Sequence, residues 1–202
     1  MHEEAIREFQ ELIKIDPNYA LAYEGISQVY FNKRNLDEAE KNLRQAAKLD
    51  PNLWQVHNLL GVIYDRQRRF EAAIVEYKAA IVLRPNVPIL FNNLGISLFL
   101  KGDYEEAVAA FGEALKLETF DKKVYNNLAL ALCKLERYQE ALDAFKKGGN
   151  DASAYYNLGN FYMVQGKYQE AIKFFGKAIE SRPVFYVQAY EKMEKAKAMD
   201  RP

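Results

Sequence analysis

The chain has 202 residues, of which 50% are hydrophobic and 28% are charged, a composition typical of a packed protein rather than a disordered one. Its 28 Lys and Arg residues balance its 28 Asp and Glu residues, which argues against a general nucleic-acid binder, because such proteins need a basic surface. No apolar run approaches the roughly 18 residues of a membrane-spanning helix, no signal peptide is recognisable, and a single cysteine excludes an intrachain disulfide.

One pattern recurs along the chain at a step of 34 residues. A large apolar residue followed by a small one stands at Ile26-Ser27, Leu60-Gly61, Leu94-Gly95 and Leu128-Ala129, and again at Leu158-Gly159 after only 30 residues. A column of small residues keeps the same step at Ala39, Ala73, Ala107 and Ala141, followed by Ala171. A period of this length predicts a series of helical hairpins, each of which buries its apolar face against the next.

The first predicted element is an unpaired helix over residues 3–17. Ala5, Phe9, Leu12 and Pro17 occupy positions of the second helix of a hairpin, with no first helix before them. An amphipathic helix without its partner leaves apolar surface uncovered. We therefore expect a truncated or processed start, and a homo-oligomer formed through this helix is one possible consequence.

Five hairpins follow, over residues 20–53, 54–87, 88–121, 122–151 and 152–185. In each, an aromatic residue, the small residue and a large residue share one face of the first helix, as Phe91, Gly95 and Leu98 do. The second helix carries small residues on either side of a bulky one. Because proline cannot continue a helix, Pro17, Pro51, Pro85 and Pro183 mark breaks between hairpins, and Thr119 replaces the proline once.

The fourth hairpin, 122–151, is four residues shorter than the others. The missing residues correspond to about one helical turn, and Gly148-Gly149 is expected to end the second helix early. The shortening is either a tolerated deletion or a local change of curvature that shapes the binding surface. After the fifth hairpin, residues 186–199 are expected to form a C-terminal helix whose polar face caps the stack.

These positions are similar to the tetratricopeptide repeat (TPR) over essentially the whole chain. The resemblance implies an all-α fold, an α-α superhelix built as a TPR solenoid of antiparallel helix pairs, and a protein that binds other proteins in a concave groove. The short fourth unit, the restart at Asn157-Leu158-Gly159 and the closing Pro183-Val184-Phe185-Tyr186 also resemble TPR lipoproteins of the tight-adherence (Flp) pilus assembly systems. That likeness implies a bacterial envelope location after removal of a lipidated leader; as it stands, the sequence indicates a cytoplasmic protein.

The search for catalytic residues leads to packing positions. His57 stands in the aromatic column of the first helices and is interpreted as a packing substitute, and Cys133 lacks a His and Asp constellation. Gly159 and Gly166-Lys167 are separated by too many residues for a phosphate-binding loop. The basic cluster Arg66, Arg68 and Arg69 is interpreted as a solvated turn. We expect no catalytic residue, no cofactor and no metal ligand.

The face of the first helices opposite the core stripe carries the candidate binding residues. Asparagine is a poor helix former, so its recurrence there is not explained by helix propensity. Its carboxamide donates and accepts hydrogen bonds, as is needed to hold the main chain of an extended peptide, and this resembles the asparagine ladder of O-linked N-acetylglucosamine transferase. Alternatively, the amides bond between hairpins. The candidate peptide-binding residues are Asn58, Val62, Ile89, Asn92, Asn93, Ile96, Leu100, Asn126, Asn127, Leu130, Asn157 and Asn160.

The sequence therefore predicts a non-enzymatic scaffold or adaptor that binds a protein or peptide segment through amide contacts and an apolar centre. Two alternatives remain: a self-assembling TPR scaffold, and a substrate-presenting fragment of a larger enzyme such as a glycosyltransferase. No nucleic-acid partner and no membrane insertion are expected.

Overall fold

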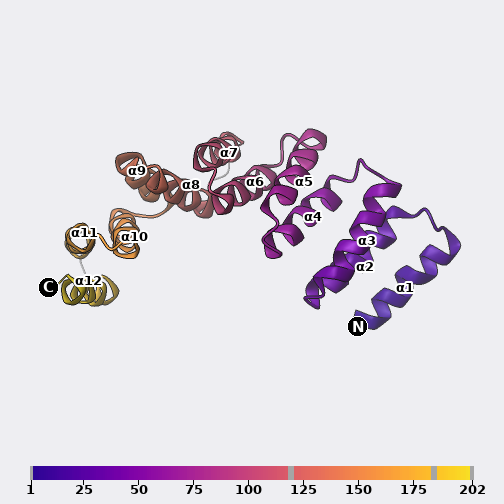
Figure 1. The fold of residues 1–202 in the computed structure, drawn as a ribbon, viewed down its shortest axis with the longest axis horizontal. Coiled ribbons are helices and arrows are strands. Elements are labelled where there is room, and N and C mark those ends of the chain that lie inside the picture. Colours follow the sequence, from indigo (N-terminus) through magenta and orange to yellow (C-terminus); the bar gives the residue numbers. More distant parts are fainter. Residues whose placement is uncertain (1, 118–120, 183–185, 201–202) are drawn as a thin grey trace. The chain divides into compact units, whose positions relative to one another are not determined.

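The structure is a computed structural model that describes residues 2–117, 121–182 and 186–200, and these residues form twelve α-helices and no strand (Figure 1). The chain divides into two compact units, Met1–Gly102 and Asp103–Pro202. Unit 1 contains α1 (His2–Ile15), α2 (Ala20–Asn32), α3 (Leu36–Leu49), α4 (Trp54–Arg66), α5 (Phe70–Leu83) and α6 (Pro88–Lys101). Unit 2 contains α7 (Tyr104–Lys116), α8 (Lys122–Lys134), α9 (Tyr138–Gly148), α10 (Asp151–Val164), α11 (Tyr168–Glu180) and α12 (Val187–Met199).

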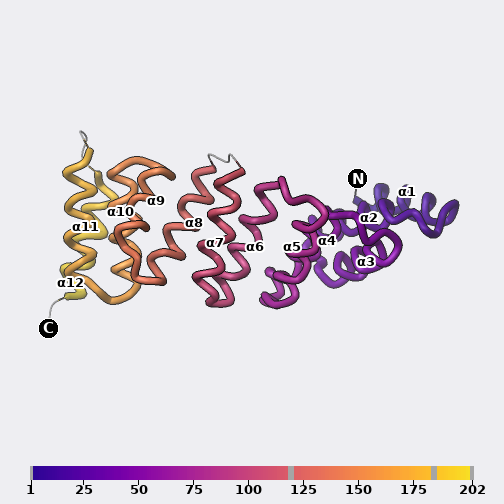
Figure 2. Tube along the Cα trace, turned by 90° about the horizontal axis from the view of Figure 1, so that it is seen from above, coloured from indigo at the N-terminus to yellow at the C-terminus, as the bar shows by residue number. Residues whose placement is uncertain are grey.

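Within each unit, consecutive helices pack against each other and their connections are short. In unit 2 the tube shows α8, α9, α10 and α11 running side by side (Figure 2). Below, α2, α4, α6, α8 and α10 are called first helices, and α3, α5, α7, α9 and α11 second helices. The predicted breaks at Thr119 and Pro183 lie outside the described residues.

The turn inside each hairpin places one residue in the left-handed region. Gly102 and Gly166 do so with φ of 105° and 72°, as expected for glycine, which has no Cβ to clash there. At the corresponding turns Arg34, Arg68 and Glu136 adopt φ of 58° to 60°. A left-handed non-glycine residue is strained, so these three turns are held by the packing of the helices on either side.

Close contact between a small residue and an aromatic ring organises the hairpins. Gly61 of α4 lies against the buried ring of Tyr77 of α5, and a methyl group at Gly61 would come within 2.6 Å of that ring. Gly159 of α10 faces Phe175 of α11 in the same way, at 2.8 Å. Gly61 and Gly159 both stand in the column of small residues that recurs along the sequence, so at these two positions the column marks a close approach between the helices of one hairpin.

The unpaired first element, α1, packs on α2. The ring of Phe9 lies against Gly25, where an added methyl group would meet it at 2.3 Å, and Ile6 is buried. In contrast, Leu12 and Ile15 are 42% and 83% exposed. α2 thus covers part of the apolar face of α1, and association of two copies through this helix remains a prediction.

In the shortened hairpin of unit 2, the residues are missing at the end of α9 and in the connection to α10. As predicted, α9 ends at Gly148, and α10 begins only three residues later. The side chain of Asn150 accepts from the backbone N–H of Ser153 at 2.8 Å, while the Ser153 hydroxyl accepts from the N–H of Asn150 at 2.9 Å. This capping box starts α10 without an extended linker.

Gly148 itself lies very close to the start of α8. A methyl group there would come within 3.1 Å of the Lys122 carbonyl oxygen and 3.2 Å of Oδ1 of Asn126. The other hairpins carry alanine at this position, for example Ala46 and Ala178, both fully buried. The glycine therefore lets the end of α9 approach α8 more closely than an alanine would allow.

The last helix, α12, starts one residue after its predicted beginning and packs on α11. Ala189 and Ala196 are fully buried, and the Gln169 amide of α11 donates to the Asp200 carboxylate that follows α12. Among the described residues, no helix has both the length and the apolar character needed to cross a bilayer.

Candidate interaction surface

The candidate binding residues all lie on first helices, and in each unit we call the face that carries them the first-helix surface of that unit. In unit 1 it comprises two residues of α4 and five of α6, and its most accessible apolar side chains are Ile89 and Leu100, which are 50% and 51% exposed. Val62 and Ile96 are half-buried, whereas Asn92 is buried, with 9% of its surface exposed. The surface of unit 1 is therefore apolar at both ends of α6.

A direct bond between carboxamides crosses this surface. Nδ2 of Asn93 on α6 donates to Oδ1 of Asn58 on α4 at 3.0 Å. The sequence left open whether these amides bind a peptide or bond between hairpins. For Asn58 and Asn93 the structure shows a bond between hairpins. The pair braces α4 to α6, and neither Oδ1 of Asn93 nor Nδ2 of Asn58 has a hydrogen-bond partner among the described residues.

A polar network beneath the surface holds the three helices α4, α5 and α6 together. The carboxylate of Asp65 accepts hydrogen bonds from the Tyr77 hydroxyl, at 2.9 Å, and from the Ser97 hydroxyl. Burial raises the pKa of Asp65 above its usual value, against the opposing effect of the two hydrogen bonds. Ser97 is fully buried, so the network fixes the register of α6 against α4.

In unit 2 the first-helix surface comprises Asn126, Asn127 and Leu130 of α8 together with Asn157 and Asn160 of α10. Leu130 is 38% exposed and the four asparagines are half-buried. Nδ2 of Asn160 donates to the main-chain oxygen of Tyr156 at 3.0 Å, within its own helix. Further along α10, Val164 is 83% exposed.

Aromatic rings of α9, α10 and α11 meet in unit 2, and the sequence pattern did not indicate this packing. Tyr162 stacks on Phe174 with centroids 5.4 Å apart and planes 13° from parallel, and it lies 5.0 Å from the ring of Tyr138. Lys177 places its ammonium group 5.7 Å and 5.5 Å from the rings of Tyr155 and Phe174. These contacts make the α10 side of the surface rigid.

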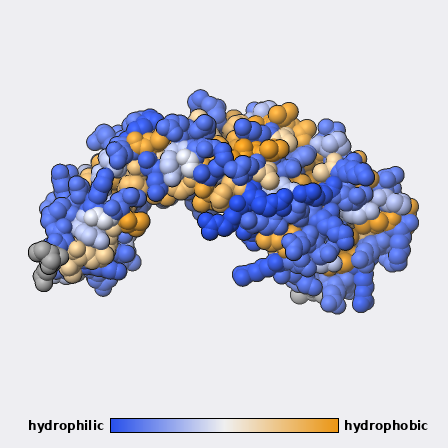
Figure 3. Space-filling model, viewed as in Figure 1, coloured by the Kyte–Doolittle hydropathy of each residue, from blue (hydrophilic) through white to orange (hydrophobic). Residues whose placement is uncertain are grey.

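The second helices of unit 1 carry apolar surface as well. Val75 and Val82 of α5 are 65% and 82% exposed, and orange surface is visible over this region (Figure 3). These valines are not among the candidate residues predicted from the sequence, which all lie on first helices. Because they lie on a different helix from the candidate residues, they are suitable control positions for substitutions at those residues.

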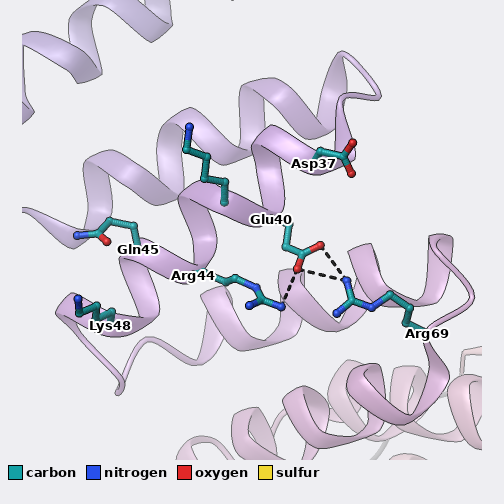
Figure 4. A pocket seen from close by; sticks show the side chains of 7 residues that line it. Asp37, Glu40, Arg44, Gln45, Lys48 and Arg69 are labelled. Atoms are coloured by element: carbon teal, nitrogen blue, oxygen red, sulfur yellow. Dashed lines mark hydrogen bonds and ion pairs between the residues drawn. The ribbon is translucent and has the colours of Figure 1, made fainter.

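A charged cleft of about 570 Å³ lies between α3 and the turn after α4, and Figure 4 shows its lining. Glu40 accepts from Nη2 of Arg44 at 2.8 Å and from Nη1 of Arg69 at 3.1 Å, and Nε2 of Gln67 donates to it at 3.2 Å. These bonds, opposed by burial, lower the pKa of Glu40. Three of the charged groups in its lining, Glu40, Arg44 and Arg69, pair with one another and join α3 to the turn after α4, and a lining this charged does not suit an apolar ligand.

The basic cluster of the turn after α4 contributes to this joint. The guanidinium group of Arg69 lies 4.4 Å from the ring of Tyr64, and that of Arg66 lies 4.2 Å from the ring of Phe31 on α2. The interpretation as a solvated turn was incomplete, because the cluster faces an aromatic residue of the preceding hairpin. Arginine stacks on such rings at little cost in hydration.

The interpretation of His57 as a packing substitute was also incomplete. Nδ1 lies 2.7 Å from Oε2 of Glu76 on α5, and Nε2 lies 3.0 Å from the main-chain oxygen of Pro51. Tyr23 makes the equivalent contact in the preceding hairpin, where its hydroxyl donates to the oxygen of Pro17 at 3.3 Å. Both partners of the ring are acceptors, so only the doubly protonated imidazole satisfies both, and the bond to Glu76 raises the pKa of His57.

The remaining reactive side chain, Cys133, is buried in the core of unit 2. Burial raises the pKa of its thiol to about 12, so the thiol stays protonated and unreactive near neutral pH. Within the part of the chain that the structure describes, no group of three or more His, Cys, Asp or Glu side chains is placed to hold a metal ion.

Successive helical hairpins that recur at a regular step, with a small residue packed against a ring of the partner helix at Gly61 and Gly159, are typical of a helical repeat protein. Family models described as tetratricopeptide repeat match residues 2–52, 25–88 and 92–149 in one case and 152–183 in the other. The chain belongs to the tetratricopeptide repeat family, and the all-α fold of α-α superhelix type is confirmed.

Solved structures with similar folds are TPR proteins. A structure of MamA has a TM-score of 0.67 and 25% identity, over 84% of this chain and 97% of MamA. YrrB, described as a TPR protein with an unusual peptide-binding site, has a TM-score of 0.72 and 20% identity, over 92% of this chain and 97% of YrrB. MamA from Desulfovibrio magneticus RS-1 has a TM-score of 0.69 and 18% identity, over 73% of this chain and 83% of that protein.

A comparison with curated proteins finds no match. Nothing in these similarities supports the resemblance to pilus assembly lipoproteins. The family and the fold are thus established, whereas these similarities do not identify a binding partner.

Proposed function

We propose that the protein is a non-enzymatic adaptor that binds a protein or peptide segment on its first-helix surface. The observation that carries this proposal is the accessible apolar surface of α6 in unit 1, where Ile89 and Leu100 are 50% and 51% exposed on a helix that also carries the carboxamide of Asn93. Apolar side chains that gather on one face of a repeat protein, with polar groups between them, are typical of an interaction site.

The chemistry of this surface favours an extended, largely uncharged segment. Apolar side chains on the ligand gain free energy by covering Ile89 and Leu100, while carboxamides match the N–H and C=O groups of its main chain. YrrB, which shares the fold over 97% of its length, is described as having a peptide-binding site, and this supports a peptide as the class of ligand.

The test begins with linear peptides selected from a display library on the full chain. Covering the exposed half of a leucine contributes roughly 1 kcal/mol, and an ammonium group at the same place would in addition have to be desolvated. Leu100→Lys should therefore weaken binding of a selected peptide by at least about tenfold. The affinity is measured by isothermal titration calorimetry.

The matched control is Val82→Lys on α5, at a position that is 82% exposed. It introduces the same charge on the same unit but outside the first-helix surface, and it should leave the affinity unchanged. If Val82→Lys abolishes binding while Leu100→Lys does not, partners use the second helices and the proposal is wrong.

A further inference from the structure

The charged cleft beside α3 holds more cationic than acidic side chains. Only two carboxylates line it, those of Asp37 and Glu40. The cationic side chains of its lining are Lys41, Arg44, Lys48 and Arg69. The cleft therefore carries a positive charge, although the chain as a whole is neutral.

Two guanidinium groups from different hairpins are held in place across this cleft. Arg44 and Arg69 both bond to Glu40, which lies between them (Figure 4). Both also lie near the ring of Tyr64, at 6.0 Å and 4.4 Å from its centroid. A guanidinium group has five N–H donors, and these bonds use only Nη2 of Arg44 and Nη1 of Arg69. The remaining donors are preorganised for a second carboxylate.

Two lysines extend the row of positive charge along α3. Lys41, Arg44 and Lys48 are three and four residues apart, so they share one face of the helix over about 10 Å. Lys48 makes no hydrogen bond or ion pair with any described residue, and Lys41 lies 3.8 Å from the exposed carboxylate of Glu38. The row follows a second helix and is therefore separate from the first-helix surface of unit 1.

Arginines of two successive hairpin turns continue the positive charge beyond Arg69. Arg34 and Arg68 hold the same left-handed position in their turns, each with φ of 60°. Arg66 lies 4.2 Å from the ring of Phe31, close to Arg34 in the sequence, so the two turns lie next to each other. Arg34, Arg66 and Arg68 are exposed, and within the part of the chain that the structure describes none of them pairs with a carboxylate.

We propose that the cationic side chains of this cleft and the arginines of the two turns form one basic face, which binds an acidic segment of a partner protein. The site lies on α3 and the turns and is independent of the proposed function. Asp37 and Glu40 favour a polypeptide over a nucleic acid. A nucleic acid carries a charge at every phosphate and would be repelled by both carboxylates, whereas a polypeptide can place uncharged residues beside them.

The spacing of the cations along α3 indicates the pattern of acidic residues in the ligand. Arg44 and Lys48 are four residues apart on the helix, which corresponds to about 6 Å. In an extended segment, side chains on one face recur at every second residue, about 7 Å apart. A segment with acidic residues at alternate positions therefore places one carboxylate near each cation.

The test follows the fluorescence anisotropy of a labelled peptide of alternating glutamate and serine as the full chain is added. Binding at about 0.1 M NaCl should disappear at about 1 M, because the Debye length falls from about 10 Å to about 3 Å. Lys48→Glu and Arg68→Glu should each weaken binding by about three- to tenfold, since an attraction becomes a repulsion. Glu136 adopts φ of 58° at the corresponding turn, so Arg68→Glu is compatible with the fold.

The matched control is Lys78→Glu on α5, an exposed position outside the cleft. It makes the same change of charge on the same unit and should leave the affinity for the acidic peptide unchanged. Leu100→Ala, on the first-helix surface of unit 1, should also leave it unchanged. These two variants separate the basic face from net charge and from the proposed function.

Three outcomes would overturn the proposal. If the acidic peptide does not bind the wild type, or if Lys78→Glu weakens binding as much as Lys48→Glu, the basic face is not a site, and the proposed function still stands. If a single-stranded DNA oligonucleotide of the same net charge binds more tightly than the peptide and is weakened by Lys48→Glu, the face binds nucleic acid rather than an acidic protein segment.

Discussion

Gly159 and Gly176 offer a matched test of the packing that makes each hairpin. They belong to the paired helices α10 and α11, and both are replaced by alanine. A methyl group at Gly159 would lie 2.8 Å from Cδ1 and Cε1 of Phe175, whose ring is fully buried, whereas at Gly176 it would meet nothing within 4 Å. Gly159→Ala therefore crowds the interior of the hairpin, whereas Gly176→Ala only replaces a flexible helical residue by a better helix former.

The magnitude follows from two opposing effects. Replacing a helical glycine by alanine stabilises by about 1 kcal/mol, equally at both positions, and forcing a methyl group into a packed core costs about 1–3 kcal/mol. Gly176→Ala should therefore raise the free energy of unfolding by about 1 kcal/mol, and Gly159→Ala should lie about 1–3 kcal/mol below it. The neighbouring hairpin carries Ala129 at the corresponding position, which shows that a hairpin can adapt to a methyl group and favours the lower end.

Thermal unfolding of the full chain, followed by circular dichroism, measures the difference, since 1 kcal/mol corresponds to about 2–4 °C in a chain of this size. In a Phe175→Leu background, the penalty of Gly159→Ala should shrink, because the ring atoms that it meets are gone. Equal shifts for Gly159→Ala and Gly176→Ala would refute the close approach of α10 and α11.

Two further predictions concern the turns and one ion pair. Arg34→Gly and Glu136→Gly should each stabilise the chain by about 1 kcal/mol, because both residues have positive φ, while Glu136→Ala keeps its Cβ and should bring no gain. If the alanine variant gains as much, relief of backbone strain is not the cause. The raised pKa of His57 contributes stability that is complete below the unfolded-state pKa of about 6.5 and is lost as pH rises through the folded-state pKa. Glu76→Gln should therefore lower the melting temperature at pH 6 more than at pH 8, and an equal loss at both values would rule out a charged His57.

The fold was predictable because the same pattern of small and large residues recurs along the chain, and at Gly61 and Gly159 it marks the same kind of contact. Gly61 and Gly159 stand where a second helix brings an aromatic ring close, so a column of small residues in the sequence reports a packing constraint directly. The early end of α9 at Gly148 was readable for the same reason, as a deviation from an established period. A single hairpin with the same residues would have given no such signal.

The use of individual polar side chains was less predictable. The sequence places Asn58, Asn93, Asn126 and Asn157 in columns, yet one pair is bonded and the other is not. That difference depends on the relative shift of neighbouring hairpins, and the positions of the asparagines in the sequence do not show this shift. The sequence also did not reveal the hydrogen bonds of His57. Its two acceptors are a main-chain oxygen and a carboxylate on another helix, and only the fold brings them to the ring.

The place where a ligand binds is the central claim, and hydrogen exchange of the full chain with and without a display-selected peptide tests it most directly. Protection should increase in α4 and α6, the helices that carry the first-helix surface of unit 1, with the largest change around Ile89 and Leu100 in α6. Protection confined to second helices such as α5, around Val75 and Val82, would contradict the account.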